Sequence, residues 1–174
     1  MTAVMYTLSP EDNPAAALLE FFYPIHYKGG IALEDVLRCG QLSRKQVAIL
    51  WLIRSEGEQG KRMRRKEIER SIQTWFEVSS SAITKALRSM ACPPLDLVQI
   101  VEDPQSAREK LVRLTPKGER FLATMVAEGQ RFEQQIVDRL TPEEVRNGIH
   151  FLQRTMAALT HTLSQSAGRN GKRR

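Results

Sequence analysis

The pattern of apolar and polar positions is clearest in the middle of the chain, where two apolar runs flank a polar, basic segment. Residues 97–118 read LVQIVEDPQSAREKLVRLTPKG, and a Thr-Pro helix start follows the second run directly. Runs of this length, separated by polar residues, are typical of the two strands of a β-hairpin. The polar segment from Glu102 to Lys110 has nine residues, so we expect a long loop rather than a tight turn.

A short amphipathic helix is expected immediately before this hairpin, between Val78 and Met90. Its apolar residues recur at helical spacing and share one face: Ala82, Ile83, Ala86, Leu87 and Met90. The opposite face carries hydroxyl and basic side chains: Ser80, Ser81, Thr84, Lys85 and Arg88. No acidic residue occurs between Ser79 and Ala91. Such a helix followed by a basic hairpin is the arrangement of a winged helix-turn-helix, which makes double-stranded DNA the leading candidate ligand.

The N-terminal segment is unusually apolar for the end of a chain. A Ser-Pro-Glu-Asp sequence beginning at Ser9 is a helix start, and we expect N-terminal helices within residues 9–40. The first of them reads AAALLEFFYPIHY, and Pro24 should kink or end it. Gly29-Gly30 should then break the chain before a second helix over residues 31–38. So many apolar side chains near a terminus favour burial against a partner.

Two helices are expected between this segment and the amphipathic helix. Ser43 and Gln46 form a capping box, and residues 47–53 are apolar nearly all round, so this helix should occupy the centre of the core. A second helix over residues 65–76 has apolar residues at helical spacing: Ile68, Ile72, Trp75 and Phe76. We expect both tryptophans of the chain to belong to the core rather than to line a ligand pocket.

Two long helices are expected at the C-terminal end. The first begins at Thr115-Pro116 and runs to Leu140, and the second begins at the capping box of residues 141–144. Their apolar stripes exceed what is needed to cover the hairpin, so we expect them to pack against the same helices of a second copy in a two-fold dimer. The basic tail, residues 168–174, should be disordered.

These elements predict a single domain over residues 1–174. Its fold class should be mostly α with a small β-hairpin wing (α+β), in which a winged helix-turn-helix over residues 41–120 is flanked by dimerisation helices. The N-terminal dimerisation helices lie within residues 9–40 and the C-terminal ones within residues 121–167. The length of 174 residues and the apolar content of 41% suit one folded domain.

The positive charge is concentrated in the predicted winged region. The chain has a formal net charge of +6, and residues 41–120 hold 16 Lys and Arg against 10 Asp and Glu. The rest of the chain is balanced, with ten residues of each sign. This distribution suits a surface that faces phosphate better than it suits a charge spread for solubility.

Basic and hydroxyl residues at three places are the candidate DNA contacts. Lys61 to Lys66 is the densest basic run and should lie at the start of the first helix of the helix-turn-helix, facing the DNA backbone. Basic residues at the wing tip suit a narrow minor groove, although acids nearby dilute their charge. The full set of candidate contacts is Arg62, Arg64, Arg65, Ser80, Ser81, Thr84, Lys85, Arg88, Arg108 and Lys110. Within it, the hydroxyl residues at positions 80, 81 and 84 should be closest to base edges.

Other chemistries find little support in the sequence. Cys39 and Cys92 lie far apart, which disfavours a disulfide framework or a zinc site, and the histidines form no ligand pair. Glycine-rich phosphate loops and nucleophile motifs are missing, so we expect no cofactor, no metal and no enzymatic activity. No signal peptide or membrane-spanning run occurs, which favours the cytoplasm.

From Leu42 to Gly118 the sequence resembles the MarR family of bacterial winged-helix regulators. The resemblance rests on four segments in order and spacing: LSRKQVAILWLI, MRRKEIERSI, VSSSAITKALRSM and REKLVRLTPKG. It implies a triangular homodimer with interlocked terminal helices, each winged domain binding half of a pseudo-palindromic operator. Members usually repress nearby genes, and many release DNA in response to a phenolic or lipophilic ligand or an oxidant. A small-molecule effector is therefore a further candidate partner.

The chain departs from the family pattern at two places. The wing of such proteins commonly reads Asp-x-Arg, the acid holding the arginine that enters the minor groove. Arg108 matches the arginine, but Ser106 stands where the acid is expected. In addition, residues 73–76 insert about one helical turn before Val78, which keeps the apolar phase because four residues rotate only about 40° beyond a full turn.

We therefore expect a homodimeric, sequence-specific transcriptional regulator, most simply a repressor. Two alternatives stay open: a winged-helix adaptor that binds another protein, and a non-specific architectural DNA binder. Cys39 is a candidate redox switch, because some proteins of this type use a cysteine near the N-terminal helices, but a half-buried structural thiol is the simpler interpretation.

Overall fold

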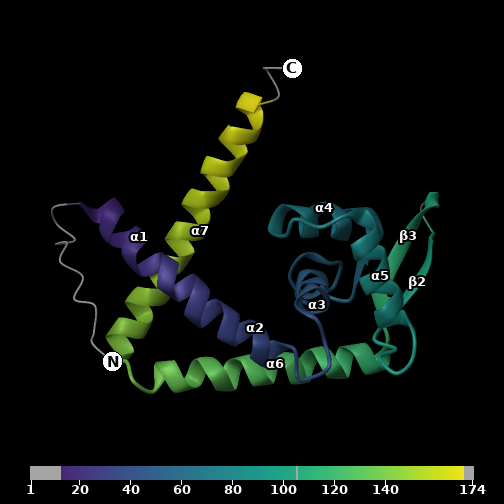
Figure 1. The fold of residues 1–174 in the computed structure, drawn as a ribbon, viewed down its shortest axis with the longest axis horizontal. Coiled ribbons are helices and arrows are strands. Elements are labelled where there is room, and N and C mark those ends of the chain that lie inside the picture. The colour runs from purple at the N-terminus through teal and green to yellow at the C-terminus, as the bar shows by residue number, and fades with distance from the viewer. Residues whose placement is uncertain (1–12, 105, 171–174) are drawn as a thin grey trace. The chain divides into compact units, whose positions relative to one another are not determined.

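The structure, a computed structural model, describes residues 13–104 and 106–170, and of residues 107, 108 and 163–170 only the backbone. Two compact units make up the chain, residues 1–130 and residues 131–174. Most of the described residues are helical, and three short strands form one antiparallel sheet (Figure 1). The predicted fold class, mostly α with a β-hairpin wing in a winged helix-turn-helix, is confirmed.

The N-terminal helical segment consists of α1 (Pro14–Pro24), the π-helix η1 (Ile25–Gly30) and α2 (Ile31–Leu37). Asn13 caps α1 by accepting a 3.0 Å hydrogen bond from the amide of Ala16, whereas the helix start predicted at residues 9–12 lies outside the described residues. The break predicted at Gly29-Gly30 is wrong. Glycine weakens a helix without ending it, and Gly30 adopts ordinary helical angles, φ −61° and ψ −45°. A wider π turn follows Pro24 and the chain stays helical.

Helix α3 (Arg44–Glu56) lies at the centre of the core. The predicted capping box is confirmed: the amide of Ser43 donates to Gln46 Oε1 at 2.8 Å, and the amide of Gln46 donates to Ser43 Oγ at 3.4 Å. The core residues of α3 are completely buried: Ile49, Leu50, Leu52 and Ile53. The same helix therefore contacts α2, β1, α4 and α5.

The prediction that both tryptophans belong to the core is wrong. Trp51 is 38% exposed and Trp75 is 47% exposed. Trp51 falls on the outer side of α3, where the guanidinium of Arg54 lies 5.0 Å from its ring centroid. The core therefore does not bury every apolar side chain of α3, and the guanidinium of Arg54 covers part of the exposed Trp51 ring.

The sheet consists of β1 (Arg62–Arg64), β2 (Val98–Asp103) and β3 (Ser106–Leu114) in the order β1-β3-β2. Val112 is the central position, because it pairs with Met63 on one side and with Ile100 on the other. The sequence analysis predicted only the β2–β3 hairpin. The strand β1 is too short and too basic to show the apolar alternation of a strand.

The hairpin connection is much shorter than predicted. The strands extend to Asp103 and Ser106, with Glu102 paired to Lys110 and a register shift between Glu102 and Asp103. The nine-residue loop is therefore wrong: most of those residues are in the strands. Polar composition misled the prediction, since the acids of this outer part pair with basic side chains of β1 and α4 and charged residues are therefore tolerated in its strands.

The helix-turn-helix consists of α4 (Arg65–Trp75) and α5 (Ser80–Ala91). Ser79 caps α5 by accepting a hydrogen bond from the amide of Ala82 at 3.3 Å. The extra residues 73–76 lengthen α4 to Trp75 and supply Phe76 as its C-cap. The apolar faces of both helices are buried as predicted, with Ile68, Ile72, Ile83, Leu87 and Met90 at 0–1% exposure.

Helix α6 (Pro116–Val137) begins where the hairpin ends. Thr115 caps it, accepting a 2.9 Å hydrogen bond from the amide of Gly118. Gly118 allows the helix to approach the start of β2, since a Cβ at this position would overlap the carbonyl oxygen of Leu97. The helix start is thereby held against the base of the hairpin.

The second unit contains the end of α6 and α7 (Pro142–Asn170). The predicted capping box is confirmed, because the amide and hydroxyl of Thr141 both donate to Glu144 Oε2, at 2.7 and 2.8 Å. The predicted disordered tail begins too early, since the helix includes residues 168–170, and residues 171–174 lie outside the description.

Candidate nucleic-acid interface

The outer face of α5 carries the predicted hydroxyl and basic residues. Ser80, Ser81, Lys85 and Arg88 are exposed, whereas Thr84 is half-buried. Among the described hydrogen bonds and ion pairs, Lys85 and Arg88 take part in none. Two unengaged cations beside short hydroxyl side chains, on a helix face without acids, form a surface that can approach a phosphate backbone and base edges.

Thr84 is held by the neighbouring helix. Nη2 of Arg65, at the first position of α4, donates to Thr84 Oγ1 at 2.8 Å, and the Thr84 hydroxyl donates to the carbonyl oxygen of Ser80 at 2.7 Å. The hydroxyl proton and one lone pair of Thr84 are therefore used within the protein. Arg65 is thus engaged with the recognition helix, and its predicted phosphate contact stays a prediction.

Arg62 and Arg64 were predicted to lie at the start of the first helix of the helix-turn-helix, but they precede it. Both are in strand β1, because the chain pairs with β3 before it turns into α4 at Arg65. Arg62 forms an ion pair with Glu58, four residues earlier in the chain. The hydrogen bond between them holds the pKa of Glu58 below its ordinary value and raises the pKa of Arg62.

Arg64 is surrounded by carboxylates. Its Nε lies 2.8 Å from Asp103 Oδ2 and 3.5 Å from Glu109 Oε2, and its Nη1 lies 4.0 Å from Glu67 Oε1. The hydrogen bond to Asp103 is the main reason why the pKa of Arg64 is raised. In the sequence, Asp103 and Glu109 stand out only as charges that dilute the basic wing. Their role as ion-pair partners of Arg64 was not predicted.

The two basic residues predicted at the wing tip, Arg108 and Lys110, both belong to strand β3. Lys110 lies in β3 and not at the tip, and its Nζ forms a 3.0 Å ion pair with Glu102 across the hairpin. Arg108 is also part of β3, but its side chain lies outside the described residues, so its minor-groove contact stays a prediction. Of the described residues, Pro104 is the turn residue that follows β2.

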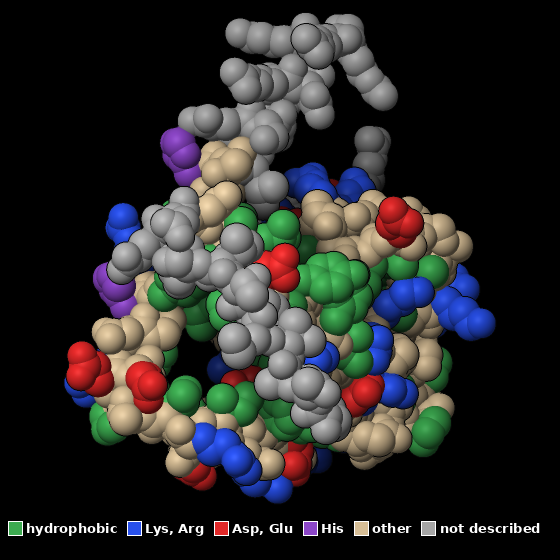
Figure 2. Space-filling view, turned by 60° about the vertical axis from the view of Figure 1, so that its left-hand side comes forward, with side chains coloured by type: hydrophobic (Ala, Val, Ile, Leu, Met, Phe, Trp, Pro, Cys, Tyr) green, Lys and Arg blue, Asp and Glu red, His purple; other side chains and the backbone are tan. Residues whose placement is uncertain are grey.

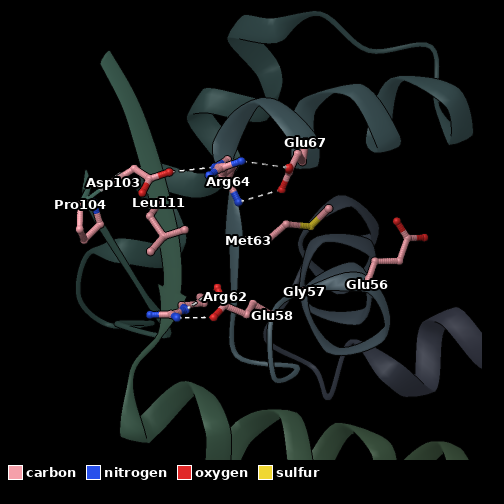
Figure 3. Close-up of a pocket in the computed structure, with 10 residues that line it drawn as sticks. All are labelled: Glu56, Gly57, Glu58, Arg62, Met63, Arg64, Glu67, Asp103, Pro104 and Leu111. Carbon is pink, nitrogen blue, oxygen red and sulfur yellow. Dashed lines mark hydrogen bonds and ion pairs between the residues drawn. The ribbon is translucent and has the colours of Figure 1, made fainter. Parts of the chain in front are cut away.

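A cavity of about 490 Å³ lies beneath the hairpin, between the end of α3, β1 and the start of α4 (Figure 3). Its apolar lining comes from Met63, Pro104 and Leu111. Its charged lining consists of Arg62 and Arg64 with four acids: Glu56, Glu58, Glu67 and Asp103. Figure 3 shows Arg64 between Asp103 and Glu67 at one edge of this space.

Other predicted site features are less prominent. Cys39, the candidate redox residue, is half-buried against the core at a left-handed position, φ 49°, and its redox role stays a prediction. Within the described residues, no group of three or more His, Cys, Asp and Glu is placed to hold a metal ion. Over the same residues, no helix has both the length and the apolar character to cross a membrane.

Comparison with known proteins relates this geometry to a known domain. A family model described as a winged helix DNA-binding domain matches residues 42–118. A search of curated proteins by sequence found no match.

Solved structures extend the comparison beyond that region. A MarR family protein from Bacillus stearothermophilus is 19% identical with a TM-score of 0.70, and the match covers 86% of this chain and 97% of that one. A cysteine-to-serine mutant of MarR from E. coli is 21% identical with a TM-score of 0.64, covering 80% and 96%. The same mutant complexed with operator DNA matches at 21% identity and a TM-score of 0.58, covering 84% and 96%. The chain therefore carries a winged helix DNA-binding domain over residues 42–118 and has the MarR fold, as the sequence resemblance predicts.

Proposed function

We propose that this protein is a homodimeric, sequence-specific DNA-binding transcriptional regulator that works in the cytoplasm as a repressor. The observation that carries the proposal is the exposed face of α5, on which Lys85 and Arg88 stand beside Ser80 and Ser81 with no acid between them. A helix of this kind within a winged helix domain suits the major groove of duplex DNA. The structural relative solved with operator DNA supports the same assignment.

The exposed apolar residues support a dimer. In the first unit, the N-terminal helices leave large apolar side chains 48–67% exposed: Leu18, Leu19, Phe21, Phe22, Tyr23, Ile25 and Tyr27. In the second unit, α7 has a similar stripe: Ile149, Phe151, Leu152, Met156 and Leu159. Hydrophobic side chains also reach the surface on the face shown in Figure 2. Monomeric proteins rarely leave so much apolar surface in water, and a second copy of the same chain would bury it.

DNA fragments selected from the source genome test the proposal. The purified protein should enrich a defined pseudo-palindromic site and bind it as a dimer. Because several phosphates contact each half-site, affinity should fall by about three decades or more between about 50 and 200 mM salt. A protein that is monomeric, or that ignores DNA even in dilute buffer, contradicts the proposal.

The same experiment separates the two alternatives. A winged-helix adaptor for another protein would show little salt-dependent DNA binding. A non-specific architectural binder would bind DNA without a footprint at any defined site. A reporter gene placed behind the selected site then distinguishes repression from activation.

A small-molecule effector is part of the proposal. The cavity beneath the hairpin, at about 490 Å³, lies within the usual size range of ligand pockets, roughly 300–1,000 Å³. A ligand changes DNA affinity only if it binds the DNA-competent and incompetent states differently. Release of the selected DNA by phenolic or lipophilic compounds, measured by fluorescence anisotropy, tests this part.

A further inference from the structure

We propose that Arg64 is a positioning residue that fixes the wing through Asp103 and Glu109, and not a residue that contacts DNA. The inference rests on the proposed function, because it assigns a role within the same DNA interface. It changes the role of a residue that composition alone places among the phosphate contacts.

The contacts of Arg64 connect four elements. The residue belongs to β1, and its carboxylate neighbours come from β2, β3 and α4: Asp103 at 2.8 Å, Glu109 at 3.5 Å and Glu67 at 4.0 Å. Lys66, in the first turn of α4, adds a second contact to Glu109 at 3.0 Å. Figure 3 shows Arg64 directed toward Asp103 and Glu67. We call Arg64, Lys66, Asp103 and Glu109 the wing latch.

The latch lies where the sheet gives the hairpin no other support. Strand β1 pairs with β3 only over residues 111–113. The part of the hairpin nearer its tip, residues 102–103 and 106–110, therefore lacks a third strand. An isolated two-stranded hairpin is marginally stable in water. The ion pairs of Arg64 and Lys66 therefore tie the outer hairpin to the start of α4, the helix that also holds α5.

The burial of Asp103 and the charge of the surrounding carboxylates both hold Arg64 against the hairpin. The side chain of Asp103 is 6% exposed, so its carboxylate is desolvated and the ion pair with Arg64 offsets part of that cost. If Arg64 turned toward a phosphate, Asp103 would lose that partner while staying buried. In addition, three carboxylates face only two cations, Arg64 and Lys66, so the cluster keeps an excess of negative charge that disfavours phosphate.

The wing position in turn governs DNA binding. A wing that holds its competent position for about a tenth of the time raises the apparent Kd about tenfold, without the loss of any direct contact. A phosphate contact behaves differently, since each one lost lowers the slope of log affinity against log salt by about 0.9. Affinity and salt slope together therefore distinguish positioning from contact.

Four variants of the full chain make the test: R64M, D103N, the double variant R64M/D103N, and R88M as a phosphate-contact control. R70M, an exposed arginine later in α4, is the matched neutral control. For each variant, affinity for the selected DNA is measured by fluorescence anisotropy across a salt series. Amide hydrogen exchange of residues 101–103 and 109–111 is measured without DNA, relative to residues 98–100 and 112–114.

We expect R64M to weaken DNA binding about tenfold per half-site with an unchanged salt slope, and to speed exchange in the outer hairpin about tenfold. D103N should also speed the hydrogen exchange of the same amides. The double variant should be no worse than R64M, because it removes the buried charge of Asp103 as well as the cation that pairs with it. R88M removes one phosphate contact from each protomer, so it should lower the salt slope of the dimer by about 1.8 and leave the hairpin amides unchanged. R70M should change neither.

The inference is overturned if R64M lowers the salt slope as R88M does, or if neither R64M nor D103N changes exchange in the outer hairpin. If R64M does not fold, D103N decides the question by the same exchange measurement. Exchange needs no DNA, so a protein that binds no DNA refutes the proposed function while the latch is still tested by the hairpin amides.

Discussion

The guanidinium of Arg65 donates a 2.8 Å hydrogen bond to the hydroxyl oxygen of Thr84, joining the first residue of α4 to the second turn of the recognition helix α5. Thr84 in turn donates to the carbonyl oxygen of Ser80. The hydroxyl is therefore committed to holding the two helices together. What Thr84 has left for a base is its methyl group and one lone pair.

This relationship predicts how two conservative substitutions of Thr84 differ. Thr84→Ser keeps the hydroxyl bonds and removes the methyl group, so it should change preference among operator bases, most clearly at thymine. Thr84→Val keeps a methyl group but breaks the bond to Arg65, so it should lower the free energy of unfolding by about 1 kcal/mol. Binding to a library of operator variants and urea unfolding measure the two effects. The reverse pattern, with Thr84→Val the stronger change in base preference, would show that the hydroxyl reads the base.

Arg88 and Lys85 should respond differently to neutral substitution. Arg88 is exposed on α5 and, among the described contacts, makes no hydrogen bond or ion pair, so we expect it to bind phosphate. Arg88→Gln should weaken binding to all sequences and, because the dimer loses two contacts, lower the salt slope by about 1.8. Lys85→Gln should instead alter preference among operators. A salt series on matched and mismatched DNA measures both, and equal affinities of both variants with wild type would contradict these roles.

Arg108 should act as a general contact of the wing. Arginine suits the focused negative potential of a narrow minor groove, so Arg108→Ala should weaken binding to all sequences rather than change preference. Gel shifts on the selected operator and on an unrelated duplex measure the effect. Unchanged affinity on both would remove Arg108 from the interface.

Leu19 provides a test of the dimer. Its side chain is 67% exposed on α1, so Leu19→Arg should not disturb the folding of the single chain. It should place a charge within the apolar contact of two copies and dissociate the dimer. Analytical ultracentrifugation at micromolar concentration measures the change, with Thr74→Arg on the exposed side of α4 as the control that adds the same charge. A dimeric Leu19→Arg protein would show that α1 lies outside the dimer contact.

Acid should release the N-terminal cap of α7. Hydrogen bonds from the amide and hydroxyl of Thr141 hold the pKa of Glu144 below its ordinary value of 4.5. A carboxylate with a lowered pKa stabilises the folded state above its unfolded pKa, and this contribution is lost as pH falls through the folded value. The stability difference between wild type and Glu144→Ala should therefore be largest above pH 4.5 and vanish in stronger acid. Circular dichroism melting across pH measures it, and a difference independent of pH would contradict this origin.

Local sequence signals determined most of the helical framework. The caps at Ser43, Ser79 and Thr141 depend on residues within one turn, and periodic apolar residues marked the buried faces of α3, α4 and α5. The resemblance between residues 42 and 118 and winged-helix regulators followed from the same local order and spacing. These features could be predicted because neighbours in sequence are also neighbours in a helix.

The tertiary structure decided the features that depend on residues far apart in sequence. Strand β1 exists only because β3 pairs with it, and that pairing moves Arg62 and Arg64 out of the predicted helix. Trp51 is exposed because the other elements cover only part of α3. Arg64 and Asp103 stand 39 positions apart, and no local pattern indicates their pairing. A charged side chain takes its role from the charges that folding brings beside it, so composition could place the basic surface in the winged region but could not separate its contacts from its supports.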